Sequence, residues 1–319
     1  MSQQFESPRP ATIRSQLMLE TVSEMVGERG YPYSQAQVRI RPQGPGPWTF
    51  TLFGSDAPDS IDQVVNREVD VAIINPSIVL TLAYRGKGPY QKPLPVRAIS
   101  VIPSRDWLGF AVNASTGLTS LADIKTQRFP LRVSLRAQRD HSVHLVVDQV
   151  LKVYGFSLSD IVEWGGEVSY DAGLPADPAR IGRAKAGEVD AIFDEAVTRF
   201  IPLAVELGMR FLPIEEPERS KLAELGMRTE AMPKAVFPML PADIPAVDFS
   251  GFPVFTNAET PESFVYEFSR ALDARKTRIA YQQPGPLPID VMCKDTPDGP
   301  LDVPLHPGAE RYWREAGYL

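Results

Sequence analysis

Several charged and hydrogen-bonding side chains are packed into the stretch RAQRDHS, residues 136–142. Apolar residues at the spacing of a helix face follow it, from Val143 to Tyr154, so the stretch should stand directly before a helix. A helix N-terminus offers unpaired N–H groups and a partial positive charge, and arginine adds paired donors for a carboxylate or phosphate. The stretch therefore predicts an anion-binding loop whose candidate ligand-binding residues are Arg136, Gln138, Arg139, His141 and Ser142.

One phrase occurs twice, as REVDVAIINPS at residues 67–77 and as GEVDAIFDEAV at residues 187–197. In each copy a Glu and an Asp precede an apolar run, and we expect these carboxylates to stay in water. Ligands of open α/β sheets bind beyond the carboxyl ends of parallel strands, so the polar residues after each run are ligand candidates; alternatively, they cap the next helices. These candidates are Asn75, Ser77, Asp194 and Glu195. A buried Asp194 or Glu195 would favour an amine or a hydroxyl group on the ligand.

A second helix N-terminus is predicted in SDAPDSIDQVVNR, which begins at Ser55 after the strand-like run WTFTLFG. Its helix would present Ile61, Val64 and Val65 on one face. Ser55 and Asp56 are therefore candidate ligand residues on the side opposite the 136–142 loop.

Strands and helices alternate along most of the chain, which predicts an α/β protein built of βαβ units. The two copies of the repeated phrase indicate two lobes, each a mostly parallel sheet flanked by helices, joined by hinge strands near 97–103 and 247–254. We expect lobe one to comprise residues 1–103 and 246–319, and lobe two to comprise 104–245. A short helix is also expected at 13–28, with Met18, Val22, Met25 and Val26 on one face.

The composition excludes several classes of function. The chain has 319 residues, 43% of them hydrophobic, and a net charge of −7, so we expect no nucleic-acid partner. Short basic pieces such as Arg180–Arg183–Lys185 are interpreted as solvated helix faces. The single cysteine, Cys293, permits no intrachain disulfide and no cysteine-based zinc site.

We also expect neither a metal nor a cofactor. His141 and His144, with Asp140 and Asp148 nearby, have the spacing of a metal site or a general base, but no third cluster of ligands accompanies them. No Walker loop, nucleophile elbow or dinucleotide fingerprint is present, and no residue is predicted to be catalytic. His306 precedes Pro307 and is expected to start a helix.

The N-terminal sequence MSQQFESPRPATIRSQ lacks the pattern of a secretory signal, and no run of 18 apolar residues occurs. As written, the chain is expected to be cytoplasmic, or periplasmic if the true start lies upstream.

Four segments resemble the TAXI group of solute receptors that serve TRAP transporters, which have the type II periplasmic-binding-protein architecture. They are FGSDAPDSIDQVVNREVDVAIINPS, the region from GFAVNASTGLTSLADIK to VLKVYGFSLSDI, GEVDAIFDEAVTRFIPLAVE, and the C-terminal helices including LHPGAERYWREAGYL. Two features depart from the group: a charged 136–142 loop replaces small residues, and Arg67 replaces a glycine.

The resemblance implies a monomeric solute-binding protein that is not an enzyme. It also implies a small carboxylate-bearing ligand, of the amino-acid or dicarboxylate class, and TRAP membrane subunits as partners. Two alternatives remain open. One is a cytoplasmic, decarboxylase-like enzyme on the same scaffold, with His141 as acid or base; the other is a ligand-sensing module.

Overall fold

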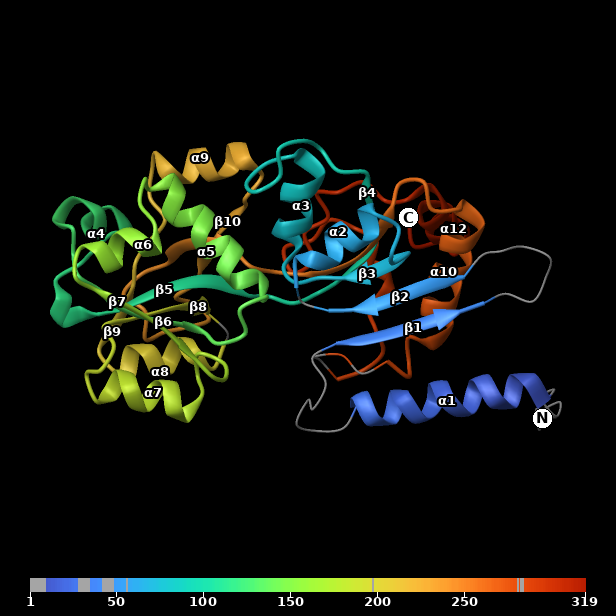
Figure 1. Ribbon diagram of the computed structural model, residues 1–319, viewed down its shortest axis with the longest axis horizontal. Helices are drawn as coiled ribbons and strands as arrows, with labels where there is room; N and C mark the ends of the chain where they lie inside the picture. Colours follow the sequence, from blue (N-terminus) through green and yellow to red (C-terminus); the bar gives the residue numbers. More distant parts are fainter. Residues whose placement is uncertain are drawn as a thin grey trace.

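The computed structural model describes residues 10–27, 35–41, 49–55, 57–196, 198–279, 281 and 284–319. It contains two β-sheets, each covered by helices, and the sheets lie in two lobes arranged end to end (Figure 1). The two-lobe α/β prediction is confirmed.

Lobe one is built around a five-stranded sheet with the order β1-β2-β3-β12-β4. Its strands are β1 (Ala36–Ile40), β2 (Phe50–Gly54), β3 (Val71–Ile73), β12 (Phe252–Asn257) and β4 (Val96–Ile102). Its helices are α1 (Pro10–Gly27), α2 (Asp59–Val65), α3 (Ser77–Arg85), α10 (Glu262–Arg275), α11 (Ile289–Met292) and α12 (Pro307–Glu315). Helix α1 lies apart from the sheet, and its apolar Leu17, Met18 and Met25 are exposed (Figure 1).

Lobe two has a seven-stranded sheet with the order β10-β11-β5-β8-β6-β7, and β9 pairs with β5. Its strands are β5 (Trp107–Asn113), β6 (Arg132–Arg136), β7 (Glu167–Asp171), β8 (Ala191–Glu195), β9 (Met209–Phe211), β10 (Thr229–Met232) and β11 (Ile244–Asp248). Its helices are the 3-10 helix η1 (Ala114–Thr116), α4 (Leu121–Gln127), α5 (Ser142–Val153), α6 (Leu158–Glu163), α7 (Pro178–Lys185), α8 (Phe200–Glu206) and α9 (Glu218–Leu225). Helices α7 and α8 cover one face of this sheet, and α5 and α6 cover the other (Figure 1).

Both sheets are mixed, whereas the sequence predicts mostly parallel ones. Among the described strand pairs, only β2–β3, β6–β7 and β6–β8 are parallel. The physical reason is the way in which the chain crosses between the lobes. Strand β12 enters lobe one from lobe two, so it runs antiparallel to both of its neighbours, β3 and β4. Likewise, β5 enters lobe two from lobe one and runs antiparallel to β8.

The chain passes between the lobes in two short crossings, 103–106 and 249–251. The crossings are hydrogen bonded to each other: Phe249 N donates to Asp106 O at 2.9 Å, and Gly251 N donates to Ser104 O at 3.0 Å. Gly251 has a φ of +82°, and a Cβ there would lie 2.5 Å from the Oγ of Ser77 in lobe one. Glycine is therefore required at this position both by its backbone and by the close approach of a helix.

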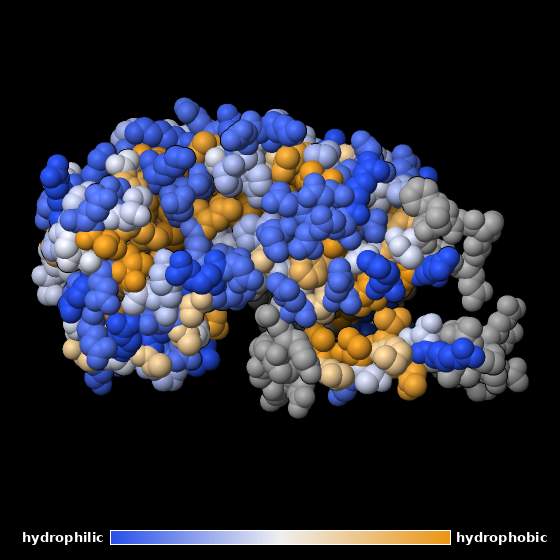
Figure 2. All heavy atoms as spheres, viewed as in Figure 1, coloured by the Kyte–Doolittle hydropathy of each residue, from blue (hydrophilic) through white to orange (hydrophobic). Residues whose placement is uncertain are grey.

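Helix α5 joins the two lobes. Its apolar face, predicted from the sequence, is fully buried at Val143, Val146 and Val150. These side chains belong to one apolar cluster with Ile78 and Leu82 of α3 in lobe one. The lobes are therefore packed together on the side of α3 and α5. On the other side of the crossings, the surface is hollowed between the lobes (Figure 2).

Candidate functional site

A cluster of buried charges lies at the carboxyl ends of β6 and β8. Arg136 ends β6, and Asp194 and Glu195 end β8. The Nη2 atom of Arg136 donates to Asp194 Oδ1 at 2.7 Å and lies 3.0 Å from Glu195 Oε2. Each of the three residues is less than a tenth exposed. Arg136, the first residue of the 136–142 stretch, thus contacts the end of the second repeat; the sequence names both as ligand candidates but does not predict this contact. However, Arg136 is the last residue of a strand and already holds two carboxylates.

Arg180 of α7 is hydrogen bonded to this cluster. It is 1% exposed, and its guanidinium donates to Asp194 Oδ2 and, at 3.2 Å, to Ser134 Oγ. The interpretation of Arg180 as part of a solvated helix face is therefore wrong, because its charge is matched inside the lobe by Asp194. Arg180 and Ala184 stand four residues apart on the buried face of α7.

His141 caps helix α5 and also contacts the cluster. Its Nδ1 accepts from Val143 N at 3.1 Å, while its Nε2 lies 2.9 Å from Arg136 Nη1 and 3.5 Å from Glu195 Oε1. Burial and the charge of Arg136 lower the pKa of His141 to about 3, so the imidazole is neutral. The described residues contain no group of three potential metal ligands around it or elsewhere.

Glu195 is a buried carboxyl group whose pKa is raised above its ordinary value. Burial raises its pKa to about 7; Arg136 opposes this rise, whereas Asp194 and Asp106 add to it. Asp106 lies in the first crossing, accepts from Ser104 Oγ at 2.6 Å, and has a pKa that is raised chiefly by burial. Sequence reasoning missed Asp106, because nothing in its local pattern distinguishes it from a surface turn residue.

Several buried polar atoms lack a hydrogen-bonding partner on residues that follow or precede strands in both lobes. They are Asn75 Oδ1, Ser77 Oγ, Trp107 Nε1, Arg136 Nε and Glu195 Oε1. All five residues are more than nine-tenths buried. Leaving such a group unpaired costs about 1–3 kcal/mol, so the unpartnered atoms at the strand ends are groups that a ligand could complete. Ser100 Oγ and His306 Nε2 share this property but lie within lobe one.

The lobe-one candidates at this site do not cap helices. Pro76 occupies the N-cap position of α3, so neither Asn75 nor Ser77 performs the capping role that was the alternative prediction. The backbone N–H of Ser77 instead donates to Ser250 O in the second crossing at 3.1 Å. Ser250 Oγ in turn donates to Asp106 O at 3.1 Å. The residue that follows β3 is thereby linked to both crossings.

The remaining candidates are more peripheral. Ser55 Oγ accepts from Ala57 N at 3.1 Å, but α2 begins only at Asp59, so Ser55 is not its cap. Asp56 lies outside the described residues. The exposed Arg139 stacks over the ring of Tyr170, with its guanidinium carbon 3.5 Å from the ring centroid, so it turns away from Arg136. Ser142 is the buried first residue of α5, and the carbonyl of the half-buried Gln138 lies 2.9 Å from His144 Nε2.

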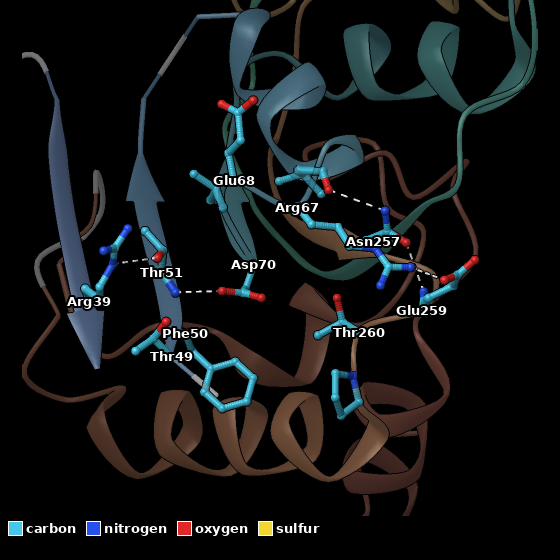
Figure 3. A pocket seen from close by; sticks show the side chains of 13 residues that line it. Arg39, Thr49, Phe50, Thr51, Arg67, Glu68, Asp70, Asn257, Glu259 and Thr260 are labelled. Carbon is cyan, nitrogen blue, oxygen red and sulfur yellow. Dashed lines mark hydrogen bonds and ion pairs between the residues drawn. The ribbon is translucent and has the colours of Figure 1, made fainter. Parts of the chain in front are cut away.

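A separate cavity of about 340 Å³ lies in lobe one, at the entry end of β3 (Figure 3). Its charged groups are largely occupied: Arg67 pairs with Glu259, and Asp70 accepts from Thr51 N at 2.7 Å. Arg67 and Glu259 are exposed. Glu68 is exposed, as expected for a carboxylate at the entrance of the strand, whereas Asp70 is only partly exposed. None of the described residues that line this cavity has an unpartnered buried polar atom, so the cavity is not the candidate site.

The candidate site is thus positioned by two α/β lobes that are joined by paired crossings. The chain belongs to the NMT1-like family, whose model matches residues 54–317. No helix in the described part of the chain is both long and apolar enough to cross a membrane.

Two similar solved structures come from Xanthomonas axonopodis pv. citri and Prochlorococcus marinus. The alkanesulfonate-binding protein SsuA from Xanthomonas axonopodis pv. citri, bound to MOPS, is 16% identical over 69% of this chain and 60% of that chain, with a TM-score of 0.34. This chain thus spans less than two thirds of that protein. PhnD1 from Prochlorococcus marinus, in complex with methylphosphonate, is 11% identical over 82% of this chain and 83% of that chain, with a TM-score of 0.38.

Proposed function

We propose that the protein is a solute-binding protein that holds one small molecule between its lobes, beside the crossings. The observation that carries this proposal is the set of unpartnered, buried polar atoms drawn from both lobes. Membership of the NMT1-like family agrees with such a role. A ligand that supplies the missing partners would contact both lobes at once and favour their closure about the crossings.

In its finer form, the proposal names a carboxylate-bearing ligand of the amino-acid or dicarboxylate class, delivered to TRAP membrane subunits. The resemblance of the sequence to the TAXI group supports this form, and so does the 12-residue helix α5, whose N-terminus stands at the site. The site predicted at Arg136 needs revision, because Asp194 and Glu195 already occupy that guanidinium. Delivery to TRAP subunits requires export, so a periplasmic location belongs to this form of the proposal.

The alternative of an enzyme is less well supported. That alternative relies on His141 as the acid or base, and a general base works best with a pKa near the working pH. The pKa of His141 is lowered to about 3, and both ring nitrogens already face neighbours. A ligand-sensing module would use the same site and differs only in its protein partner.

Native mass spectrometry of gently purified protein tests the proposal. We expect a bound small molecule that is released on denaturation. Asn75→Ala should reduce its occupancy, whereas Asn66→Ala, an exposed control in the same lobe, should not. Absence of any bound molecule, together with no thermal shift across a panel of amino acids and dicarboxylates, would rule out the solute-binding role.

A further inference from the structure

Two of the unpartnered buried atoms at the site are acceptors without a donor, Glu195 Oε1 and Asn75 Oδ1. Resting on the proposed function, we infer that Glu195 receives a protonated amine of the ligand, so the protein selects amino acids over dicarboxylates. Glu195 is thus a specificity-determining residue.

The contacts of Arg136 leave Glu195 Oε1 available to accept a hydrogen bond from an amine of the ligand. Arg136 Nη2 lies 3.0 Å from Glu195 Oε2, which fixes the carboxyl group, and Oε1 has no hydrogen-bonding partner. Among the described residues, His141 Nε2 lies 3.5 Å from Oε1, beyond normal hydrogen-bond length. A charged N–H donor from a ligand would complete this carboxylate.

The charges of the buried groups also favour an ammonium group on the ligand. Two guanidinium groups, Arg136 and Arg180, stand against three carboxyl groups, Asp106, Asp194 and Glu195. His141 is neutral and adds no positive charge. With all carboxyl groups ionised, the cluster carries one negative charge that these residues do not match. A second carboxylate on the ligand would be repelled here, whereas an ammonium group restores neutrality.

Arg136 also lacks the two adjacent free N–H groups that a ligand carboxylate needs. A bidentate pair uses two adjacent N–H groups of one guanidinium. The Nη1 atom of Arg136 faces His141 and Nη2 is shared by Asp194 and Glu195, so only Nε remains without a partner. Arg136 therefore positions Glu195 and does not bind an anionic group of the ligand. Asp194, held by Arg180, keeps Arg136 in place.

The test compares pairs of molecules that differ only in the amine. Titration calorimetry measures the affinity of L-glutamate against glutarate, L-alanine against propionate, and L-phenylalanine against 3-phenylpropionate. For the pair that fits the site, we expect the amino acid to bind at least tenfold more tightly, because a charge-assisted hydrogen bond is lost with the amine. Glu195→Gln should reduce this ratio at least fivefold. Glu167→Gln, an exposed glutamate in the same sheet, should leave it unchanged.

The pH dependence of the affinity provides a second test, because it reports the protonation of Glu195. Glu195 faces Arg136 on β6, Asp194 on β8, Asp106 in the crossing and His141 before α5. Since an ammonium group binds the ionised form, the affinity for the amino acid should fall by up to tenfold per pH unit between pH 6.5 and 5.5. In Glu195→Gln this fall should be absent. A change that arises only from altered folding would not remove it selectively.

The outcomes separate the two claims. A deaminated analogue that binds as tightly as its amino acid, or a co-purified dicarboxylate, overturns the role of Glu195 and leaves the solute-binding function intact. The absence of binding by any probe, with no co-purified molecule, overturns both. If Glu195→Gln does not fold, the affinity ratio and the pH profile of the wild-type protein decide the question.

Discussion

Arg180 of α7 donates to Asp194 of β8, and both side chains are buried to within 1% of full coverage. The other oxygen of Asp194 holds Arg136 at 2.7 Å. One carboxylate therefore connects the helix beneath the sheet to the guanidinium that orients Glu195. This connection makes the interior of lobe two part of the ligand site.

Replacing Arg180 with Met should destabilise the protein by about 3–5 kcal/mol, because a buried carboxylate would lose one of its two guanidinium partners. Urea denaturation provides the measurement. Lys185→Met, on the exposed face of the same helix, should change the free energy of unfolding by no more than about 0.5 kcal/mol. Equal effects of the two substitutions would contradict the role of Arg180.

The stability of the protein should reveal the opposed titrations of Glu195 and His141. The pKa of Glu195 is raised from 4.5 to about 7, so the native state binds the extra proton and stability falls as pH rises between these values. The pKa of His141 is lowered from 6.5 to about 3, so the unfolded state binds the proton and stability rises up to pH 6.5. Between pH 4.5 and 6.5 the two contributions oppose each other.

Single variants should separate these contributions. Relative to wild type, Glu195→Gln should add a positive slope of stability with pH, and His141→Asn a negative one, each of up to about 1.4 kcal/mol per pH unit. Urea denaturation at pH 5.0, 5.5, 6.0 and 6.5 measures both slopes. Because the other titrating groups are common to all three proteins, their contributions cancel in the differences. Slopes of the same sign in the two variants would refute this assignment.

Gly251→Ala should be more harmful than the same change at another glycine of similar conformation. Gly117 also has positive φ, +74°, but a Cβ there meets nothing within 4 Å. Both substitutions incur a backbone cost of about 1–2 kcal/mol. Only Gly251→Ala adds an overlap with Ser77 Oγ, worth about another 1–3 kcal/mol. Thermal unfolding of the two variants, and of Gly251→Ala combined with Ser77→Gly, measures the difference.

Arg228 precedes β10 in lobe two and bridges to lobe one through Asp302 at 2.7 Å and Asp295 at 3.0 Å. Arg228→Met should loosen the contact between the lobes, because these ion pairs link Arg228 of lobe two to Asp295 and Asp302 of lobe one. We expect amide hydrogen exchange at 103–106 and 249–251 to accelerate about two- to tenfold. Arg270→Met, which removes an exposed pair within α10, serves as the control. Unchanged exchange in Arg228→Met would exclude a role in closure.

The local elements could be predicted from the sequence, and the long-range ones could not. The spacing of Val143, Val146 and Val150 predicts α5, and the structure contains that helix. The burial of Arg180 depends on Asp194, which comes from a different element, so no local pattern establishes it. The antiparallel direction of β12 likewise arises from the crossing between the lobes. The residue pattern of an apolar strand does not indicate whether the strand runs parallel or antiparallel to its neighbours.

Only part of the candidate site could be predicted from the sequence, because some of its contacts join residues of different elements. Strand ends identify Asn75, Ser77, Asp194 and Glu195 as candidates, because the carboxyl ends of parallel strands border ligand crevices. The partners of Arg136 could not be foreseen, since they depend on the register of β6 against β8. Their pairing converts an expected anion receptor into a group that orients a carboxylate.

The position of β12 between β3 and β4 has a consequence for synthesis on the ribosome. Every strand of lobe two has been made once residue 248 is translated, whereas β12, which joins β3 to β4 in lobe one, ends at Asn257. Until then, β3 lacks its partner on one edge and β4 lacks the strand that attaches it to the sheet. The nascent chain therefore carries an unfinished sheet for most of its translation, and the segment that closes it arrives in the last quarter of the polypeptide.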